Sequence, residues 1–243
     1  MVLPKTRYLA FSYHLFLSLF FFLVIFSTMY IFWFPGALFQ ASGGWEGIKI
    51  IAAVDIVLGP AITLIVYNTR KPQKELIRDL FIILVIQLSC LAYGVHVVHQ
   101  SRPIAAVLVF DTFYTFKKQD YLDQGISQEK VKDLTTLTTK LFYVETSTDT
   151  DTFLMEHVKS LLGGTPLERD ITRYKVIKAT DIEKNSEGVF DNNHSCYLYD
   201  IETVYNTGRI CFSPKTQRFV YFKTENNLIE TEATPSAHGD TKK

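Results

Sequence analysis

Apolar residues fill the first hundred positions of the chain in three long runs. Tyr8 to Phe34 contains no Asp, Glu, Lys or Arg, and Ile48 to Tyr67 and Leu80 to Val98 are the other two runs. A helix needs about 20 residues to cross a bilayer core about 30 Å thick, and each run meets that length. The first run exceeds the roughly 7–15 apolar residues of a signal-peptide core, which indicates a retained helix. We predict transmembrane helices over about 8–34, 48–67 and 79–99.

Basic residues flank these predicted spans unevenly. Lys5 and Arg7 precede the first span, whereas the segment between the first and second spans has no Lys or Arg. The segment between the second and third spans contains Arg70, Lys71, Lys74 and Arg78. Because cytoplasmic loops collect Lys and Arg, we predict a cytoplasmic N-terminus. The membrane region is then residues 1–102, and the chain after about Gln100 lies outside the cytoplasm.

Beyond Pro103 the pattern changes to short strands and polar helices. Ile104 to Phe110 is typical of a strand, and 112–116 is expected to extend it past Asp111. The remaining pattern predicts helices over 127–137 and 149–162, and strands over 140–146, 196–212 and 218–225. A tight turn is expected at Asn206 to Gly208. We predict a small α+β domain over 103–224.

Composition changes at the same boundary. Of the 25 acidic residues, 21 follow Pro103, together with 17 Lys and Arg, so this part has a formal charge of −4. That balance argues against nucleic acid as a partner. The final segment, 225–243, is polar enough to be expected as a disordered tail.

Two of the three cysteines, Cys196 and Cys211, lie in the part predicted outside the cytoplasm, where disulfides form. A bridge between them would contribute about 3 kcal/mol in the loop-entropy model. The expected turn at Asn206 to Gly208 would place Cys211 opposite about Thr203, so a bridge then requires a bulge or a bent strand. The disulfide stands as a hypothesis. Cys90, in the third span, is interpreted as a packing residue.

The second span contains an ionisable Asp55 and a helix-breaking Gly59–Pro60 pair. A carboxylate near the middle of a span costs about 2.5–3.5 kcal/mol on insertion scales, so it normally faces a partner or a wet cavity. Pro60 cannot donate to the carbonyl of Ile56, which concentrates polarity beside Asp55.

A rise of about 1.5 Å per residue sets the depth of each side chain in the membrane. It predicts Tyr93 or His96 of the third span as the internal partner of Asp55 and places His14 too far away. Asp55 then either fixes helix packing through a structural hydrogen bond or binds a partner directly.

Motifs for catalysis or cofactor binding are not apparent in the sequence. His96 and His99 have a helical spacing but no third metal ligand in sequence reach. The polar segment Asp191 to Cys196 lacks a nucleophile-elbow or cysteine-protease signature and is interpreted as a loop before a strand. Trp45 is expected at the membrane interface. We predict no enzyme, no cofactor and no metal.

The sequence GGWEGIKIIAAVDIVLGPAITLIVYN, followed by RKPQKELIRDL, IQLSCLAYGVHVVHQSRP and the apolar strand after them, resembles the type IV pilin accessory proteins of the TfpX/TfpZ family. The likeness is dense from Gly43 to about Phe110 and looser beyond, where Cys196 and Cys211 still fit. It implies a multi-pass protein of the Gram-negative bacterial inner membrane with a C-terminal periplasmic domain.

The implied role is a pilin-specific chaperone or stabiliser in the biogenesis of the type IV pilus, or fimbrium, with the major pilin and the lipid bilayer as partners. Our hypothesis for the residues that bind the partner comprises Trp45, Asp55, Gly59, Pro60, Tyr93 and His96. The alternative is a membrane-anchored periplasmic sensor or regulatory protein, which would need a cytoplasmic output module where this chain has short tails and one loop.

Overall fold

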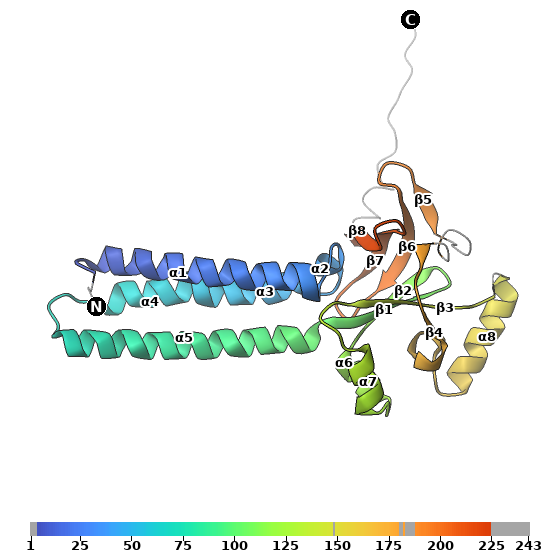
Figure 1. Ribbon diagram of the computed structural model, residues 1–243, viewed down its shortest axis with the longest axis horizontal. Helices are drawn as coiled ribbons and strands as arrows, with labels where there is room; N and C mark the ends of the chain where they lie inside the picture. Colours follow the sequence, from blue (N-terminus) through green and yellow to red (C-terminus); the bar gives the residue numbers. More distant parts are fainter. Residues whose placement is uncertain (1–3, 148, 180–181, 183–187, 225–243) are drawn as a thin grey trace, which may run out of the picture. The chain divides into compact units, whose positions relative to one another are not determined.

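A computed structural model gives the fold of the chain and describes residues 4–147, 149–179, 182 and 188–224 (Figure 1). The predicted tail over 225–243 lies outside the described residues. The chain forms two compact units. The helical unit contains the chain up to Pro35, Gly43–Pro103 and Lys117–Thr139, and the sheet unit contains Gly36–Ser42, Ile104–Phe116 and the chain from Lys140.

Three helices of the helical unit, Arg7–Trp33, Gly44–Val66 and Gln73–Ser101, are long and apolar enough to cross a membrane, as the hydrophobic runs predict. The second and third begin before the apolar runs do, at Gly44 and Gln73. Their segments are α1 (Arg7–Thr28) with η1 (Met29–Trp33), then α3 (Gly44–Ala52), η2 (Ala53–Leu58) and α4 (Gly59–Val66), and then α5 (Gln73–Ser101). We call α3, η2 and α4 together the middle helix.

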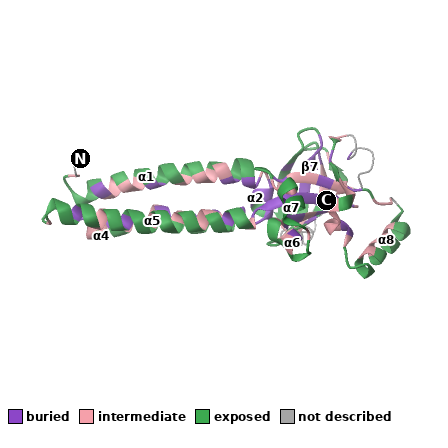
Figure 2. Cartoon of the chain, turned by 60° about the horizontal axis from the view of Figure 1, so that its bottom comes forward, coloured by how far each residue is buried: buried purple, intermediate pink, exposed green. Residues whose placement is uncertain are grey.

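Both α1 and α5 pack along the middle helix, and they make few contacts with each other. Gly47 allows a close approach, because a Cβ there would come within 2.7 Å of the Val98 side chain. Figure 2 shows mostly exposed residues along α1 and α5. Large apolar side chains such as Phe16 and Phe81 are among them. Such a surface suits contact with lipid.

The segment after the first two strands returns to the helical unit as α6 (Lys118–Asp123) and α7 (Gln128–Leu134). Buried Arg102 fixes the end of this segment by donating hydrogen bonds to the carbonyls of Thr136 and Leu137 at 2.7 and 2.9 Å. Thr139 donates to the carbonyl of Pro103 at 2.9 Å. These bonds hold the segment that ends at Thr139 within the helical unit.

Among the described residues of the sheet unit, eight strands form one sheet, in the order β4-β3-β1-β2-β6-β7-β8 with β5 also paired to β6. Pairs β1–β3 and β2–β6 are parallel, and β3–β4, β5–β6, β6–β7 and β7–β8 are antiparallel. The strands are β1 (Pro103–Val109), β2 (Thr112–Lys117), β3 (Lys140–Val144), β4 (Tyr174–Val176), β5 (Val189–Asp191), β6 (Cys196–Glu202), β7 (Thr207–Ser213) and β8 (Arg218–Thr224). The helix α8 (Thr150–Leu162) and two 3₁₀ turns, Leu167–Arg169 and Ile171–Arg173, follow β3.

Two local predictions in this unit are wrong. The chain does not extend β1 past Asp111: it turns at Phe110, whose φ is 56°, and returns as β2 beside β1. The tight turn is not at Asn206 to Gly208 either, because Glu202 pairs with Thr207 and the loop is residues 203–206. The hydroxyl of Thr203 organises this loop by accepting hydrogen bonds from the backbone N–H groups of Tyr205 and Asn206.

The loop between the first two long helices contributes to the core of the sheet unit. It forms the short helix α2 (Leu38–Ala41), and the backbone N–H of Ala37 donates to the carbonyl of Phe219 at 3.1 Å. Leu38 and Ala41 are fully buried in a cluster with Phe113, Ile201, Ile210 and Phe212. The segment therefore packs onto the sheet through its apolar side chains.

Candidate functional site

The middle helix widens where Asp55 lies. The backbone N–H of Gly59 donates to the carbonyl of Val54, five residues back, which is the π-helical spacing. In that register the next donor would be the nitrogen of Pro60 and its acceptor the carbonyl of Asp55, but proline has no N–H. The carbonyl that loses its helical donor is therefore that of Asp55 itself, whereas α-helical spacing predicts Ile56.

Gln87 of α5 supplies the missing donor. Its Nε2 donates to the carbonyl of Asp55 at 3.3 Å and to the hydroxyl of Ser18 at 3.1 Å. Gly59 makes room for the amide, because a Cβ at that position would lie 2.5 Å from it. Pro60 thus leaves the Asp55 carbonyl without a helical donor, Gly59 makes room for the amide, and Gln87 supplies the replacement donor. The sequence-based reasoning missed Gln87, although a polar residue within an apolar run is the signal that could have found it.

His14 of α1 lies at the other end of the same hydrogen-bond network. Its Nε2 is 2.7 Å from Oε1 of Gln87, and its Nδ1 is 2.5 Å from the hydroxyl of Thr63. A carbonyl oxygen only accepts, so Nε2 carries a hydrogen. The depth estimate excludes His14 as a neighbour of Asp55, but the structure shows both lining one pocket, with Gln87 between them.

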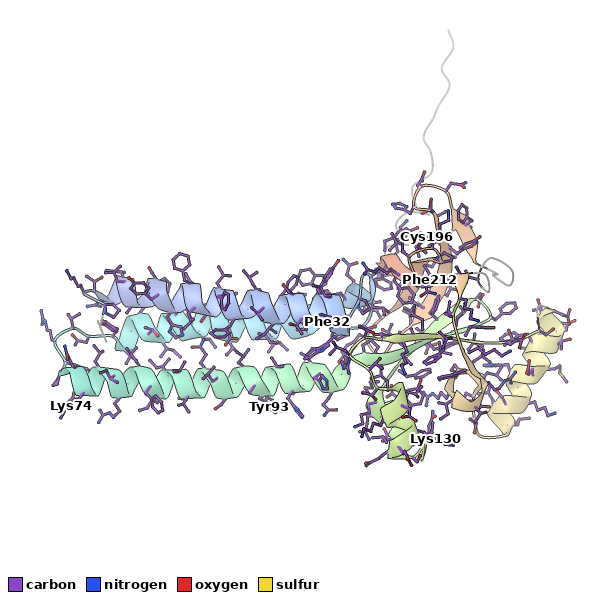
Figure 3. All side chains as sticks on the ribbon, in the orientation of Figure 1. Phe32, Lys74, Tyr93, Lys130, Cys196 and Phe212 are labelled. Atoms are coloured by element: carbon purple, nitrogen blue, oxygen red, sulfur yellow. A yellow bond between two sulfur atoms is a disulfide. The ribbon has the colours of Figure 1, made fainter. Side chains whose placement is uncertain are left out.

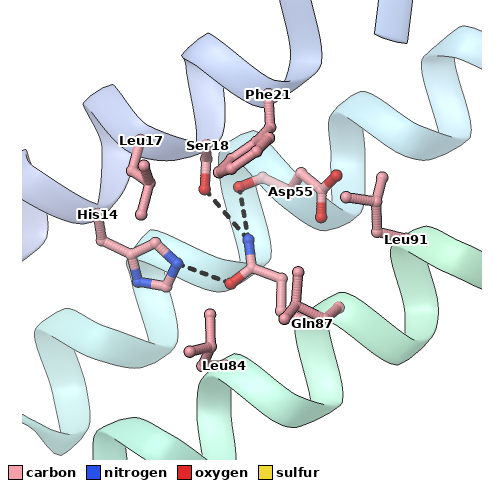
Figure 4. A pocket seen from close by; sticks show the side chains of 9 residues that line it. His14, Leu17, Ser18, Phe21, Asp55, Leu84, Gln87 and Leu91 are labelled. Carbon is pink, nitrogen blue, oxygen red and sulfur yellow. Dashed lines mark hydrogen bonds between the residues drawn. The ribbon is translucent and has the colours of Figure 1, made fainter. Parts of the chain in front are cut away.

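The carboxylate of Asp55 has no partner within this network. The residue is 2% exposed, and neither side-chain oxygen has a hydrogen-bond partner among the described residues. Figure 4 shows the carboxylate turned away from the Gln87 amide, toward Leu91. The pocket has a volume of about 40 Å³, and its wall is otherwise apolar, formed by Leu17, Phe21, Leu84, Leu88 and Leu91. This volume is enough for a small polar group.

Tyr93 and His96, the neighbours that the sequence predicts for Asp55, lie on another face of α5. Tyr93 is 71% exposed and points away from the other two long helices in Figure 3, and His96 is exposed too. Residues 84, 87, 88 and 91 form the face that lines the pocket. A helix turns about 100° per residue, so Tyr93, two positions after Leu91, faces nearly the opposite way. Trp45, in the first turn of α3, is 43% exposed.

The sheet unit brings Cys196 and Cys211 together as a disulfide with a Cα–Cα distance of 5.7 Å. Leu198 lies opposite Cys211 in the β6–β7 pair. Cys196, two residues before Leu198, is therefore the diagonal neighbour of Cys211 on the same face of the hairpin. The two sulfurs and the carboxylate of Asp191 lie within 4.8 Å of one another. Because both sulfurs are in the disulfide, they are not thiolate ligands for a metal.

Asp191 braces the disulfide-bonded hairpin. Its Oδ2 accepts hydrogen bonds from Nδ1 of His194 and from the hydroxyl of Tyr221, both at 2.9 Å. These bonds, that from His194 first, lower the pKa of Asp191 below its ordinary value. Burial, followed by the bond to Asp191, raises the pKa of Tyr221 to about 12. Asp191, in the polar segment before β6, thus contacts His194 within that segment and Tyr221 of β8.

Three curated proteins resemble this chain, each at 31% identity over 115 residues, or 47% of the chain. They are the fimbrial assembly proteins of Dichelobacter nodosus from serogroup E1, from serogroups C1 and C2, and from serogroup I. The match spans 45% of the serogroup E1 and I proteins and 88% of the protein from serogroups C1 and C2. No family model matches the chain, and no solved structure matches it.

Proposed function

This chain belongs to the family of the Dichelobacter nodosus fimbrial assembly proteins, and we propose that it serves type IV pilus biogenesis as an inner-membrane helper for one pilin. In this proposal it holds the pilin as a chaperone or stabiliser before the pilin enters the pilus. It performs no catalysis in that role. The membrane association and the link to fimbrial assembly rest on the three apolar helices and on family membership.

The proposed orientation places the N-terminus in the cytoplasm and the sheet unit in the periplasm. Lys5, Arg7 and the four basic residues between 70 and 78 support it, because Lys and Arg collect on the cytoplasmic side. The bond between Cys196 and Cys211 suits the periplasm, where disulfides persist.

The observation that carries the proposal is the pocket between α1 and α5 that contains the buried carboxylate of Asp55. Residues of both helices line it, and Asp55 of the middle helix is buried beside them. A pilin that awaits assembly is a single transmembrane stem with an extracytoplasmic head. A stem that packs between α1 and α5 would cover the pocket, and its apolar side chains would contact Leu17, Phe21 and Leu91.

A second contact surface in the proposal lies on α8 of the sheet unit. Phe153 holds one face of this helix to the sheet by stacking on Phe110, with ring centroids 4.6 Å apart. The other face exposes an apolar stripe, and Leu162 is 85% exposed. The α8 stripe consists of Leu154, Met155, Val158, Leu161 and Leu162. We assign it to the pilin head, since exposed apolar stripes of this kind mark interaction surfaces.

The test compares pilin abundance and pilin co-purification in cells that carry wild-type protein, Asp55→Asn or Asp55→Leu. Ser89→Ala is the matched control, because Ser89 is exposed on α5 and its hydroxyl donates to the carbonyl of Val85 in the same helix. We expect Asp55→Leu to lower pilin capture at least tenfold at equal helper abundance and Ser89→Ala to leave it unchanged. Unchanged capture in Asp55→Leu would remove this pocket from the mechanism.

A further inference from the structure

We infer that the Asp55 pocket binds an ammonium group that is carried within the membrane by a transmembrane segment of the partner. The inference relies on the proposed function only for the identity of that partner. The chemistry of the bound group follows from the pocket itself.

The hydrogen-bond inventory of the pocket leaves the Asp55 carboxylate unpaired. Both N–H groups of the Gln87 amide have acceptors, one in the Ser18 hydroxyl and one in the backbone carbonyl of Asp55. Both ring nitrogens of His14 are engaged by Thr63 and Gln87. The polar side chains around Asp55 are thus committed elsewhere, while its two oxygens, each with room for two hydrogen bonds, have none among the described residues.

The position of Asp55 along its helix selects the source of the missing donor. Asp55 stands eleven residues from Gly44 and eleven from Val66, the two ends of the middle helix. At 1.5 Å per residue it is roughly 16 Å from either end, close to the middle of the span. The amino groups of lipids lie at the membrane surface, so the donor comes from a protein segment that reaches the same depth.

The two unpaired oxygens of the carboxylate select the type of donor. An ionised carboxylate at the middle of a span is stable only beside a positive charge or several donors, and an ammonium group provides both. The pocket volume of about 40 Å³ admits such a compact head, and the apolar wall suits the carbon chain behind it. A guanidinium group is larger, planar and more demanding of matched acceptors. An amino-terminal or lysine ammonium therefore fits best.

The test uses the purified full chain in uncharged detergent micelles, with dodecylammonium as the probe and dodecanol as its neutral counterpart. The readout is the unfolding temperature as the probe is added. The control variant is Asp79→Asn, which removes a carboxylate that pairs with Lys71 near the start of α5. Asp55→Glu tests the charge itself in a chain that keeps a carboxylate, should Asp55→Asn fail to fold.

We expect dodecylammonium to raise the unfolding temperature of the wild type, Asp79→Asn and Asp55→Glu, and dodecanol to leave it unchanged. Asp55→Asn should need at least a tenfold higher probe concentration for the same shift. An equal response of Asp55→Asn, or of the wild type to dodecanol, would overturn the inference.

The two proposals can fail separately. An ammonium response that needs Asp55, with normal pilin capture in Asp55→Leu, would support the ammonium site and contradict the proposed function. Pilin capture that needs Asp55, without any ammonium response, would support the proposed function and overturn the inference.

Discussion

The side chain of Gln87 donates a hydrogen bond to the backbone carbonyl of Asp55, the carbonyl that Pro60 leaves without a helical donor. This one contact joins α5 to the widened turn of the middle helix. It satisfies the backbone of Asp55, while the carboxylate has no hydrogen-bond partner in the part of the chain that the structure describes. A polar group of a partner can therefore bind Asp55 without first breaking the bonds that hold these helices together.

The first prediction concerns this bond. Gln87→Leu removes the donor to the Asp55 carbonyl and the Ser18 hydroxyl and the acceptor beside His14. Buried polar groups left without partners cost about 1–3 kcal/mol, so we expect a destabilisation of that size. The measurement is the free energy of unfolding in detergent micelles. Gln100→Leu, the same change at an exposed position of α5, should have little effect. Equal losses in the two variants would contradict the bridging role of Gln87.

The second prediction concerns the disulfide. Replacing both Cys196 and Cys211 by Ser should lower the stability of the sheet unit by about 3 kcal/mol, the loop-entropy contribution for a sequence separation of 15. Denaturant unfolding followed by circular dichroism measures this loss of stability. Cys90→Ser is the control, because Cys90 is free and exposed. A double variant as stable as Cys90→Ser would show that the bond contributes nothing.

The third prediction concerns pH. The folded pKa of Asp191 is lowered, so its contribution to stability is present above the unfolded pKa of about 3.9 and is lost as pH falls through the folded value. Unfolding measured from pH 6 down to pH 2 should show this loss, and Asp191→Asn should reduce it. The folded pKa of Tyr221 is raised to about 12, so its contribution is full below about pH 10 and disappears as pH rises toward 12.

Tyr221→Phe provides the matched control for that pH profile, because it removes only the hydroxyl that donates to Asp191. It should bring the acid transition closer to that of an ordinary aspartate and remove the loss of stability above pH 10. Profiles identical to wild type at both ends would refute the coupling between Asp191 and Tyr221.

The fourth prediction concerns the α8 stripe. Introducing Lys at both Met155 and Leu162 should lower pilin capture severalfold without changing the fold, since both side chains are exposed. Co-purification of the pilin from cells measures the effect. Val204→Lys adds a charge at an exposed apolar position of the β6–β7 loop and should capture pilin normally. Equal capture by all these variants would remove α8 from the account.

The sequence predicts the three apolar helices well because length and composition alone decide whether a helix can cross a membrane. It predicts the depth of Asp55 in the membrane less well, because the middle helix begins at Gly44, before the apolar run. Rotation is a separate matter. The rise per residue gives the depth of a side chain but not the direction in which it points around the helix axis. Tyr93 and His96 were therefore expected beside Asp55, where the structure places Gln87 and Leu91.

Other features depend on packing that no local pattern records. The π-helical register at η2 changes which carbonyl Pro60 leaves unpaired. The segment around Leu38 reads as a connecting loop, yet its apolar side chains complete the core of the sheet unit. The β6–β7 hairpin turns at residues 203–206, before the position that the Asn206–Gly208 pattern predicts, because Thr203 holds the loop.

The proposed function places a pilin stem between α1 and α5, and photo-crosslinking in intact cells can detect the stem at that position. A benzoylphenylalanine at Phe21, on the wall of the pocket, is compared with one at Tyr93, which points away from it. We expect Phe21 to crosslink to the pilin stem, Asp55→Leu to abolish this product, and Tyr93 to yield little of it. Equal crosslinking from both positions, or no pilin product from Phe21, would show that the stem does not lie between α1 and α5.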